Sequence, residues 1–376
     1  MNSTISGINS INKGRNLTID SARVLFTLAV FMGHTNRLIQ NHETEPLYMC
    51  FGFLGVEFFF ILSGYLMAAN VEKKKDTEVG AATIKFIFCK FKRIFPYFAI
   101  AWSIAMLISN YNVGFTNFFI LTIKALPCIF FVNLAGFDAY QILAPTWYIS
   151  AMLLSELVLY PILIRYRKTF SMSIAPVISI FVYGYLIHTA GNLATISSPE
   201  GFYNGLLRGF AGVSLGCICF EASKALSVLH LNTRGGHLFA VIEIIAFGLA
   251  LFSQKTHGGF RPDFIFLIMV SVGIIAGFCN KNTFTTRFTS SCKYIGNFSL
   301  CYYLADRISI VATMKLLPEA ARDERLPMAF AIATTIALII MVGGNFLSSF
   351  AKKFVTQLRK WFLETERMDN TPQKSQ

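Results

Sequence analysis

Apolar stretches long enough to cross a bilayer recur along the whole chain, separated by short polar segments. A helix of about 20 apolar residues spans the hydrocarbon core. Such spans lie near 24–41, 48–69, 94–113, 146–164, 173–191, 204–222, 238–253, 263–279, 295–315 and 327–348. An eleventh apolar segment, 117–136, carries Lys124 and Pro127 in its middle. The pattern predicts an all-α polytopic membrane protein with about ten transmembrane helices.

The positions of the basic residues favour ten crossings over eleven, because Lys and Arg accumulate in cytoplasmic loops. With ten spans and a cytoplasmic N-terminus, 24 of the 33 basic residues fall on the inner side. An eleventh crossing would move segment 165–168 and the basic tail, with Lys352 and Lys353, to the outer side. We therefore predict that both termini are cytoplasmic and that 117–136 is a re-entrant or interfacial segment.

Composition agrees with a membrane class and narrows the possible partners. Hydrophobic residues make up 54 % of the chain and charged residues 14 %, against about 25 % charged in a soluble domain. The net charge of +13 follows the predicted topology, so we expect the lipid bilayer and no nucleic acid as a partner. Residues 1–350 are predicted to form one transmembrane domain and 351–376 a basic cytoplasmic tail. The N-terminal segment 1–19 is polar and lacks the apolar core of a removable signal peptide.

Arg23 at the start of the first apolar span and His34 within it belong to residue types that are expensive in a membrane and usually functional there. Ten residues separate Arg23 from His34, so the two side chains differ in depth by about 16 Å in a helix. Glu57 lies nine residues beyond Tyr48, which places it about 13 Å below the outer boundary. We expect Glu57 to meet His34 near mid-membrane. The alternatives are that His34 is a core histidine, that Arg23 only anchors the helix end, and that Glu57 only forms a hydrogen bond within the helix packing.

Three further motifs follow the first span. The run from Gly55 to Tyr65 lies in the second span, Arg93 opens the third, and Trp147 begins the fourth. With these motifs the chain resembles the acyltransferase 3 family, bacterial membrane enzymes that acylate cell-surface saccharides. The family's hallmark is an arginine followed, after ten residues, by a histidine in the first helix. Its second-helix motif is similar to Gly55–Tyr65, and an arginine opens its third helix.

The resemblance implies transfer of an acyl group, acetyl in the first instance, from cytoplasmic acyl-CoA to a saccharide hydroxyl or its lipid-linked precursor. It also implies a multi-pass protein of the bacterial inner membrane. His34 would be the general base and Glu57 would orient it, while Arg23 and Arg93 would bind the phosphates of the donor. Trp147 and Tyr65 are assigned to the substrate side. No metal and no bound cofactor is expected, and the eight cysteines show no paired metal spacing.

The chain departs from the family pattern at two places. Many members carry an acidic pair five and six residues after the tryptophan, where this chain has Met152 and Leu153. In the ninth span Leu300 replaces a tyrosine and Asp306 replaces the usual histidine. These departures leave the acceptor open.

Other polar residues within the spans carry no assigned role. Ser63 could be a nucleophile, but together with Gly64 it is better explained by close helix contact through small residues. Glu156, Glu243 and His188 are interpreted as core hydrogen-bonding groups.

Two rival functions remain at this point. A transporter or flippase of lipid-linked saccharide would use the same intramembrane charges, but it would show discontinuous helices and repeated halves. A glycan polymerase would have large outer loops, whereas the predicted loops are short.

Overall fold

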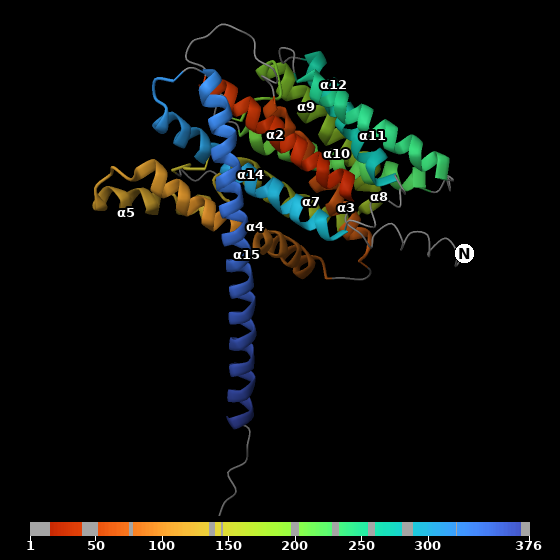
Figure 1. The fold of residues 1–376 in the computed structure, drawn as a ribbon. Helices are drawn as coiled ribbons and strands as arrows, with labels where there is room; N and C mark the ends of the chain where they lie inside the picture. Colours follow the sequence, from red (N-terminus) through yellow and green to blue (C-terminus); the bar gives the residue numbers. More distant parts are fainter. Residues whose placement is uncertain are drawn as a thin grey trace, which may run out of the picture.

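The computed structural model describes residues 16–39, 52–74, 78–134, 140–143, 146–196, 203–227, 233–254, 260–279, 289–320 and 322–369. The described residues are helical apart from short connections, and they include no strand. The described part of each of the ten predicted spans lies mostly on one long helix (Figure 1). These are α2 (Leu17–Ile39), α3 (Gly55–Glu72), α4 (Val79–Asn110), α7 (Thr146–Arg165), α9 (Ala175–Ala190), α10 (Asn204–Ser227), α11 (Thr233–Ser253), α12 (Phe260–Cys279), α14 (Thr289–Leu316) and α15 (Arg322–Asp369).

The chain is an all-helical multi-pass membrane protein. Seven helices within the described ranges are long and apolar enough to cross a bilayer by themselves. The full count of ten crossings and the side of each terminus stay predictions. The short elements are η1 (Gly52–Leu54), α5 (Phe115–Lys124), α6 (Leu126–Ile129), α8 (Arg167–Thr169) and η2 (Phe170–Ile174).

Five helices form a closed ring, which we call the helical ring. Within it α2 packs against α3, α3 against α7, α7 against α4, α4 against α14, and α14 against α2. The remaining long helices lie outside, with α10 packed against α3, α7, α9 and α12, and α15 packed against α4 and α14. The ring therefore brings together side chains from the first, second, third, fourth and ninth predicted spans.

Small residues let α3 and α10 approach closely. A Cβ atom added to Gly64 would lie 2.0 Å from the carbonyl oxygen of Val213, and one added to Gly216 would lie 2.0 Å from that of Ile61. Only glycine fits such contacts, which are typical of helix pairs in membranes. The interpretation of Gly64 as a close helix contact is confirmed.

Segment 117–136 does not form one continuous helix. It breaks between α5 and α6, and the amide of Tyr140 donates to the carbonyl of Lys124 (2.9 Å) while the Tyr140 hydroxyl reaches Asn110 (3.3 Å). Between these ends Phe131, in a left-handed conformation (φ 55°), packs on Phe98 of α4 at a ring distance of 4.7 Å. Phe98 lies twelve residues before Asn110, or about 18 Å along the helix. The segment thus enters the bundle and returns, consistent with the predicted re-entrant segment.

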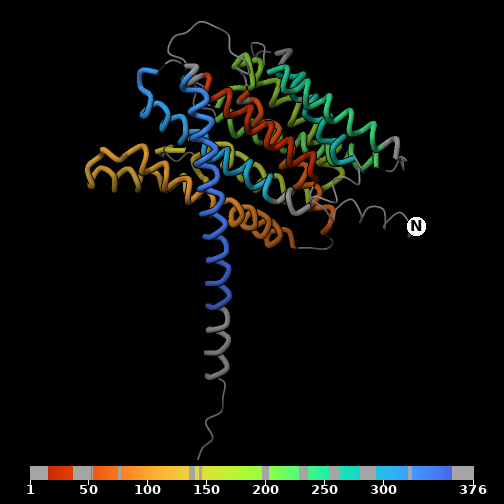
Figure 2. Tube along the Cα trace, viewed as in Figure 1, coloured from red at the N-terminus to blue at the C-terminus, as the bar shows by residue number. Residues whose placement is uncertain are grey.

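Two helices are much longer than their apolar spans. Helix α4 begins at Val79, where the Glu78 carboxylate accepts from the amides of Gly80 and Ala81 as an N-cap. Helix α15 runs without a break through the predicted domain boundary at residue 350. In Figure 2 α15 extends far past the rest of the bundle, and the α5 segment projects sideways from it.

Candidate active site in the helical ring

His34 binds a carboxylate from the other end of the sequence. Its Nδ1 atom lies 2.5 Å from Oδ2 of Asp306 on α14. The Asp306 side chain is buried, so the carboxylate end of this contact lies inside the protein. With Asp306 ionised, the bond needs the hydrogen on Nδ1, which leaves the lone pair of the imidazole on Nε2. A histidine in this state can accept a proton.

The pairing of α2 with α14 fixes this contact. Thr27 and Ser299 share a hydrogen bond of 2.8 Å between their hydroxyls, and His34 meets Asp306 seven residues later on both helices. Two helices that keep the same offset over two turns run parallel in register. The position of Asp306, where the family usually has a histidine, is therefore the position opposite His34.

The sequence led us to expect that Glu57 orients His34, but the structure places Glu57 elsewhere. Its two carboxylate oxygens accept hydrogen bonds from Arg208 Nε (2.6 Å) and from the Tyr183 hydroxyl (2.6 Å). Arg208 belongs to α10 and Tyr183 to α9, and Glu57 and Arg208 are both buried. The predicted partnership of Glu57 with His34 is wrong, and Asp306 takes that place.

The error lies in the predicted depth of Glu57. The prediction counted from Tyr48, which lies outside the described residues; the described part of the second span begins with η1 at Gly52 and α3 at Gly55. Phe58 stacks on Phe26 of α2 with ring centroids 4.4 Å apart, so Glu57 stands near the level of Phe26. His34 lies eight residues further along α2, or about 12 Å away.

Arg23 and Arg93 lie in one group of cations. Arg23 Nη1 binds the buried carboxylate of Asp20 at 3.0 Å, one turn earlier on α2. Arg93 is exposed on α4, and both arginines lie close enough to Lys90 for their charges to interact with its ammonium group. We call Arg23, Lys90 and Arg93 the cation cluster. It lies toward the predicted inner end of the ring.

Lys90 also takes part in a buried polar triad. Its ammonium group donates to Ser63 Oγ (2.8 Å) and to the Glu156 carboxylate, and Ser63 donates to the same carboxylate oxygen at 2.8 Å. Glu156 is fully buried on α7. Ser63 therefore bridges a buried ion pair between α4 and α7, and Glu156 has an assigned partner.

Tyr65 and Trp147 pack away from His34. The Tyr65 hydroxyl pairs with Ser223 Oγ (2.8 Å), and its ring stacks on Phe278 of α12 with centroids 3.9 Å apart. This position, at the contact of α3 with α10 and α12, does not support the predicted substrate-binding role of Tyr65. The Trp147 ring lies 5.0 Å from the guanidinium carbon of Arg208 and supports that buried cation.

Sequence reasoning missed Lys90 and Arg208. Arg208 stands five residues into the apolar span 204–222, and an intramembrane arginine is the same signal that identified Arg23. Lys90 lies three residues before Arg93 and therefore on the same face of a helix. It had been counted only as loop charge.

The three side chains of the candidate site that carry a titratable or cationic group are only partly buried. The side chains of His34, Arg23 and Lys90 keep 31 %, 20 % and 23 % of their surface exposed, although each bonds to a buried carboxylate. Polar groups at membrane depth face the interior of a bundle rather than lipid.

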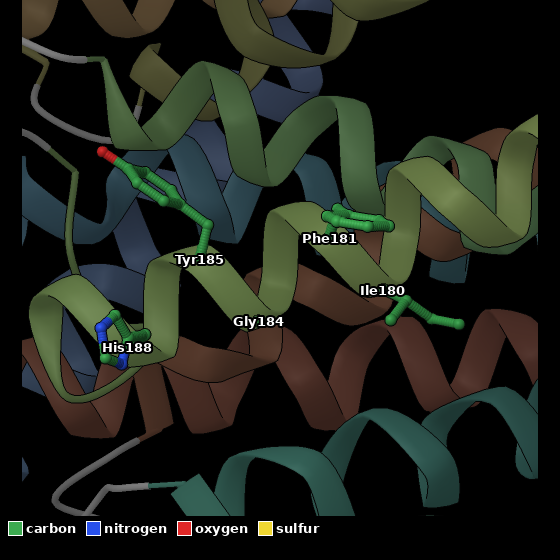
Figure 3. A pocket seen from close by; sticks show the side chains of 5 residues that line it. All are labelled: Ile180, Phe181, Gly184, Tyr185 and His188. Carbon is green, nitrogen blue, oxygen red and sulfur yellow. The ribbon is translucent and has the colours of Figure 1, made fainter.

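A hollow on α9 belongs to the outer surface. Figure 3 shows its lining side chains projecting from one helix: Ile180, Phe181, Gly184, Tyr185 and His188. Ile180 and Phe181 are among the most exposed apolar residues of the described chain, as expected where lipid tails cover a helix. His188 thus lies outside the ring.

A histidine held by a buried carboxylate, inside a bundle of membrane helices and next to a cation cluster, is an arrangement suited to group transfer within a membrane. The family model described as an acyltransferase domain matches residues 16–348, nearly the whole chain. The chain belongs to the acyltransferase 3 family and is a membrane acyltransferase. Comparisons with curated proteins and with solved structures gave no match.

Proposed function

We propose that the protein moves an acyl group, acetyl in the first instance, from cytoplasmic acyl-CoA to a hydroxyl of a cell-surface saccharide or its lipid-linked precursor. The observation that carries the proposal is the His34–Asp306 pair, whose histidine lies on the same helix as Arg23 and eleven residues beyond it. One helix thus presents a phosphate-directed cation at one depth and a proton acceptor about 16 Å further on. The setting is the bacterial inner membrane, where cytoplasmic donor and surface acceptor are on opposite sides.

His34 acts as the general base in this proposal. Nε2 takes the proton of the acceptor hydroxyl as its oxygen forms a bond to the acyl carbon. The carbon–sulfur bond then breaks, and the thiolate of coenzyme A leaves with the electron pair. Asp306 holds the imidazole in one tautomer and stabilises the imidazolium that forms. The proton passes from His34 to the departing thiolate or to water. A covalent acyl-enzyme would need the same base.

The cation cluster holds the donor. Coenzyme A carries its phosphates at one end and its thioester at the other, so phosphates bound by Arg23 and Arg93 leave the arm to reach toward His34. Arginine suits phosphate because its planar guanidinium donates two parallel hydrogen bonds. Lys90, tied to Glu156 and Ser63, adds a fixed positive charge beside them.

The test uses purified protein in lipid nanodiscs, radiolabelled acetyl-CoA and surface glycans extracted from bacterial envelopes. Label should appear in a glycan fraction together with stoichiometric release of free coenzyme A. Mild alkali should remove that label, as it does an ester on oxygen. Label that stays in acetyl-CoA or goes only to water, across all glycan fractions, would contradict a saccharide acceptor.

A further inference from the structure

Three aromatic side chains, each from a different helix of the helical ring, pack against one another. Phe59 of α3, Tyr148 of α7 and Tyr303 of α14 form a triangle with ring centroids 5.8 to 6.4 Å apart on every side. Aromatic rings in edge-to-face contact have separations of about 4.5–7 Å, so all three pairs touch. We call this set the aromatic triangle.

The triangle lies between the cation cluster and the His34–Asp306 pair. Tyr303 precedes Asp306 by three residues, about 4.5 Å toward the predicted inner end of α14, and the two side chains interact electrostatically. Tyr148 lies within electrostatic range of Arg23, Glu156 and Glu57. Tyr303 is thus the corner nearest to Asp306 along α14, and Tyr148 is the corner that senses the charge of Arg23.

Packing around the triangle holds it in place, although two of its three side chains are not fully buried. Phe60, next to Phe59 on α3, lies against Tyr148 with centroids 4.7 Å apart. Phe59 and Tyr148 are only half-buried, whereas Tyr303 is buried. Three rings that touch one another at this level would close any passage between the helices of the ring.

We propose that the aromatic triangle is the constriction through which the acyl end of the donor reaches His34, and that it selects acyl groups by size. The inference rests on the proposed function, because a donor held at Arg23 and Arg93 must send its thioester about 16 Å along α2. The direct line runs past Phe59, Tyr148 and Tyr303. The rings swing apart around the slender arm, and they keep water and protons from crossing when no donor is bound.

The first experiment tests whether the aromatic triangle blocks the passage of protons, which we call the seal. It does not depend on acyl transfer. Phe59→Ala and Tyr148→Ala proteins are reconstituted into vesicles that contain a pH-sensitive dye, and proton entry is recorded after an acid pulse. Matched controls are Phe181→Ala and Tyr185→Ala, the same changes on the exposed face of α9 shown in Figure 3. The triangle variants should leak protons several-fold faster than wild type and controls. Vesicles of both variants as tight as the controls would overturn the constriction.

The second experiment measures acyl selectivity with a gentler change. Phe59→Leu removes the flat ring but keeps most of the apolar volume, and its thermal unfolding curve verifies the fold. One methylene changes recognition in an apolar site by about 10–200-fold. The butyryl-CoA to acetyl-CoA ratio of kcat/KM should therefore rise at least about tenfold in Phe59→Leu. An unchanged ratio in an active, folded variant would overturn size selection.

The two experiments separate the proposals. Leaky triangle variants of a protein that transfers no acyl group would remove the proposed function and the donor path but keep the seal. A wild-type protein that acylates glycans, with variants as tight and selective as the controls, would keep the proposed function and remove the triangle's role.

Discussion

His34 carries the proton transfer in the proposed reaction, and this role can be tested at one position. His34→Gln keeps a side chain that forms hydrogen bonds but cannot take up the proton. Transfer should fall by on the order of 10²–10⁴, while acyl-CoA binding measured by calorimetry should be nearly unchanged. A His34→Gln protein with near-normal turnover would make the histidine a structural residue and remove the mechanism.

The roles of the Asp306 and Glu57 carboxylates can be distinguished by substitution. Asp306→Asn should lower kcat by about ten- to a hundredfold, because a hydrogen bond to a charged group contributes about 1.5–3 kcal/mol. Its thermal stability should change little. Glu57→Gln should act differently, because it leaves the Arg208 cation buried without its counter-charge. Loss of one partner of a buried pair costs about 3–5 kcal/mol, seen as a lower unfolding temperature. Reversed results would restore Glu57 as the residue that orients the base.

Donor affinity depends on the cation cluster in this scheme. Arg23→Ala and Arg93→Ala should each weaken acyl-CoA binding by about ten- to a hundredfold, because each removes a charged hydrogen bond to phosphate worth about 1.5–3 kcal/mol. The corresponding changes to Lys should restore part of the affinity, since an ammonium group lacks the planar fork. Equilibrium binding of a fluorescent acyl-CoA analogue measures the donor affinity of the alanine and the lysine variants. Unchanged affinity in the folded alanine variants would leave the arginines as membrane anchors.

Among the helices, α3 depends most clearly on close packing. Gly64→Val would place a side chain where only 2.0 Å separates the Cβ position from the Val213 carbonyl. The helices would have to separate, which costs about 1–3 kcal/mol or more. Gly184→Val on α9 is the control, because nothing lies within 4 Å of its Cβ position. Thermal unfolding in detergent should show a lower midpoint for Gly64→Val alone, and equal midpoints would argue against tight α3–α10 contact.

Helix positions followed from the sequence, but their ends and partners did not. Apolar residues identify the part of a helix that lies in lipid, so the described part of every predicted span lies mostly on a helix. Hydropathy carries no signal where a helix continues in water, which is why α4 and α15 extend beyond their spans. Asp306 could be identified as unusual but not paired with His34, because 272 residues separate them. Glu57 was misassigned because its depth was counted from an assumed outer boundary, whereas the packing of Phe58 on Phe26 sets its level.

For the whole molecule, the testable property is its orientation in the membrane. A green fluorescent protein fused after Lys353 should fluoresce, and alkaline phosphatase fused there should be inactive, because the basic tail is predicted on the inner side. The same pair fused after Gly114, between α4 and α5, should give the opposite result. Phosphatase activity after Lys353 would contradict ten crossings and make segment 117–136 a full crossing.

Helix α15 continues for 48 residues without a break, or about 72 Å. A bilayer with its headgroups is only about 40–45 Å thick. Close to 30 Å of the helix therefore remains beyond the membrane when it stands upright, in agreement with the rod that leaves the bundle in Figure 1. Such a rod is stiff, unlike a flexible tether. Its length sets the distance between its end and the membrane. Deleting seven residues would bring whatever is attached to that end about 10 Å closer to the lipid surface.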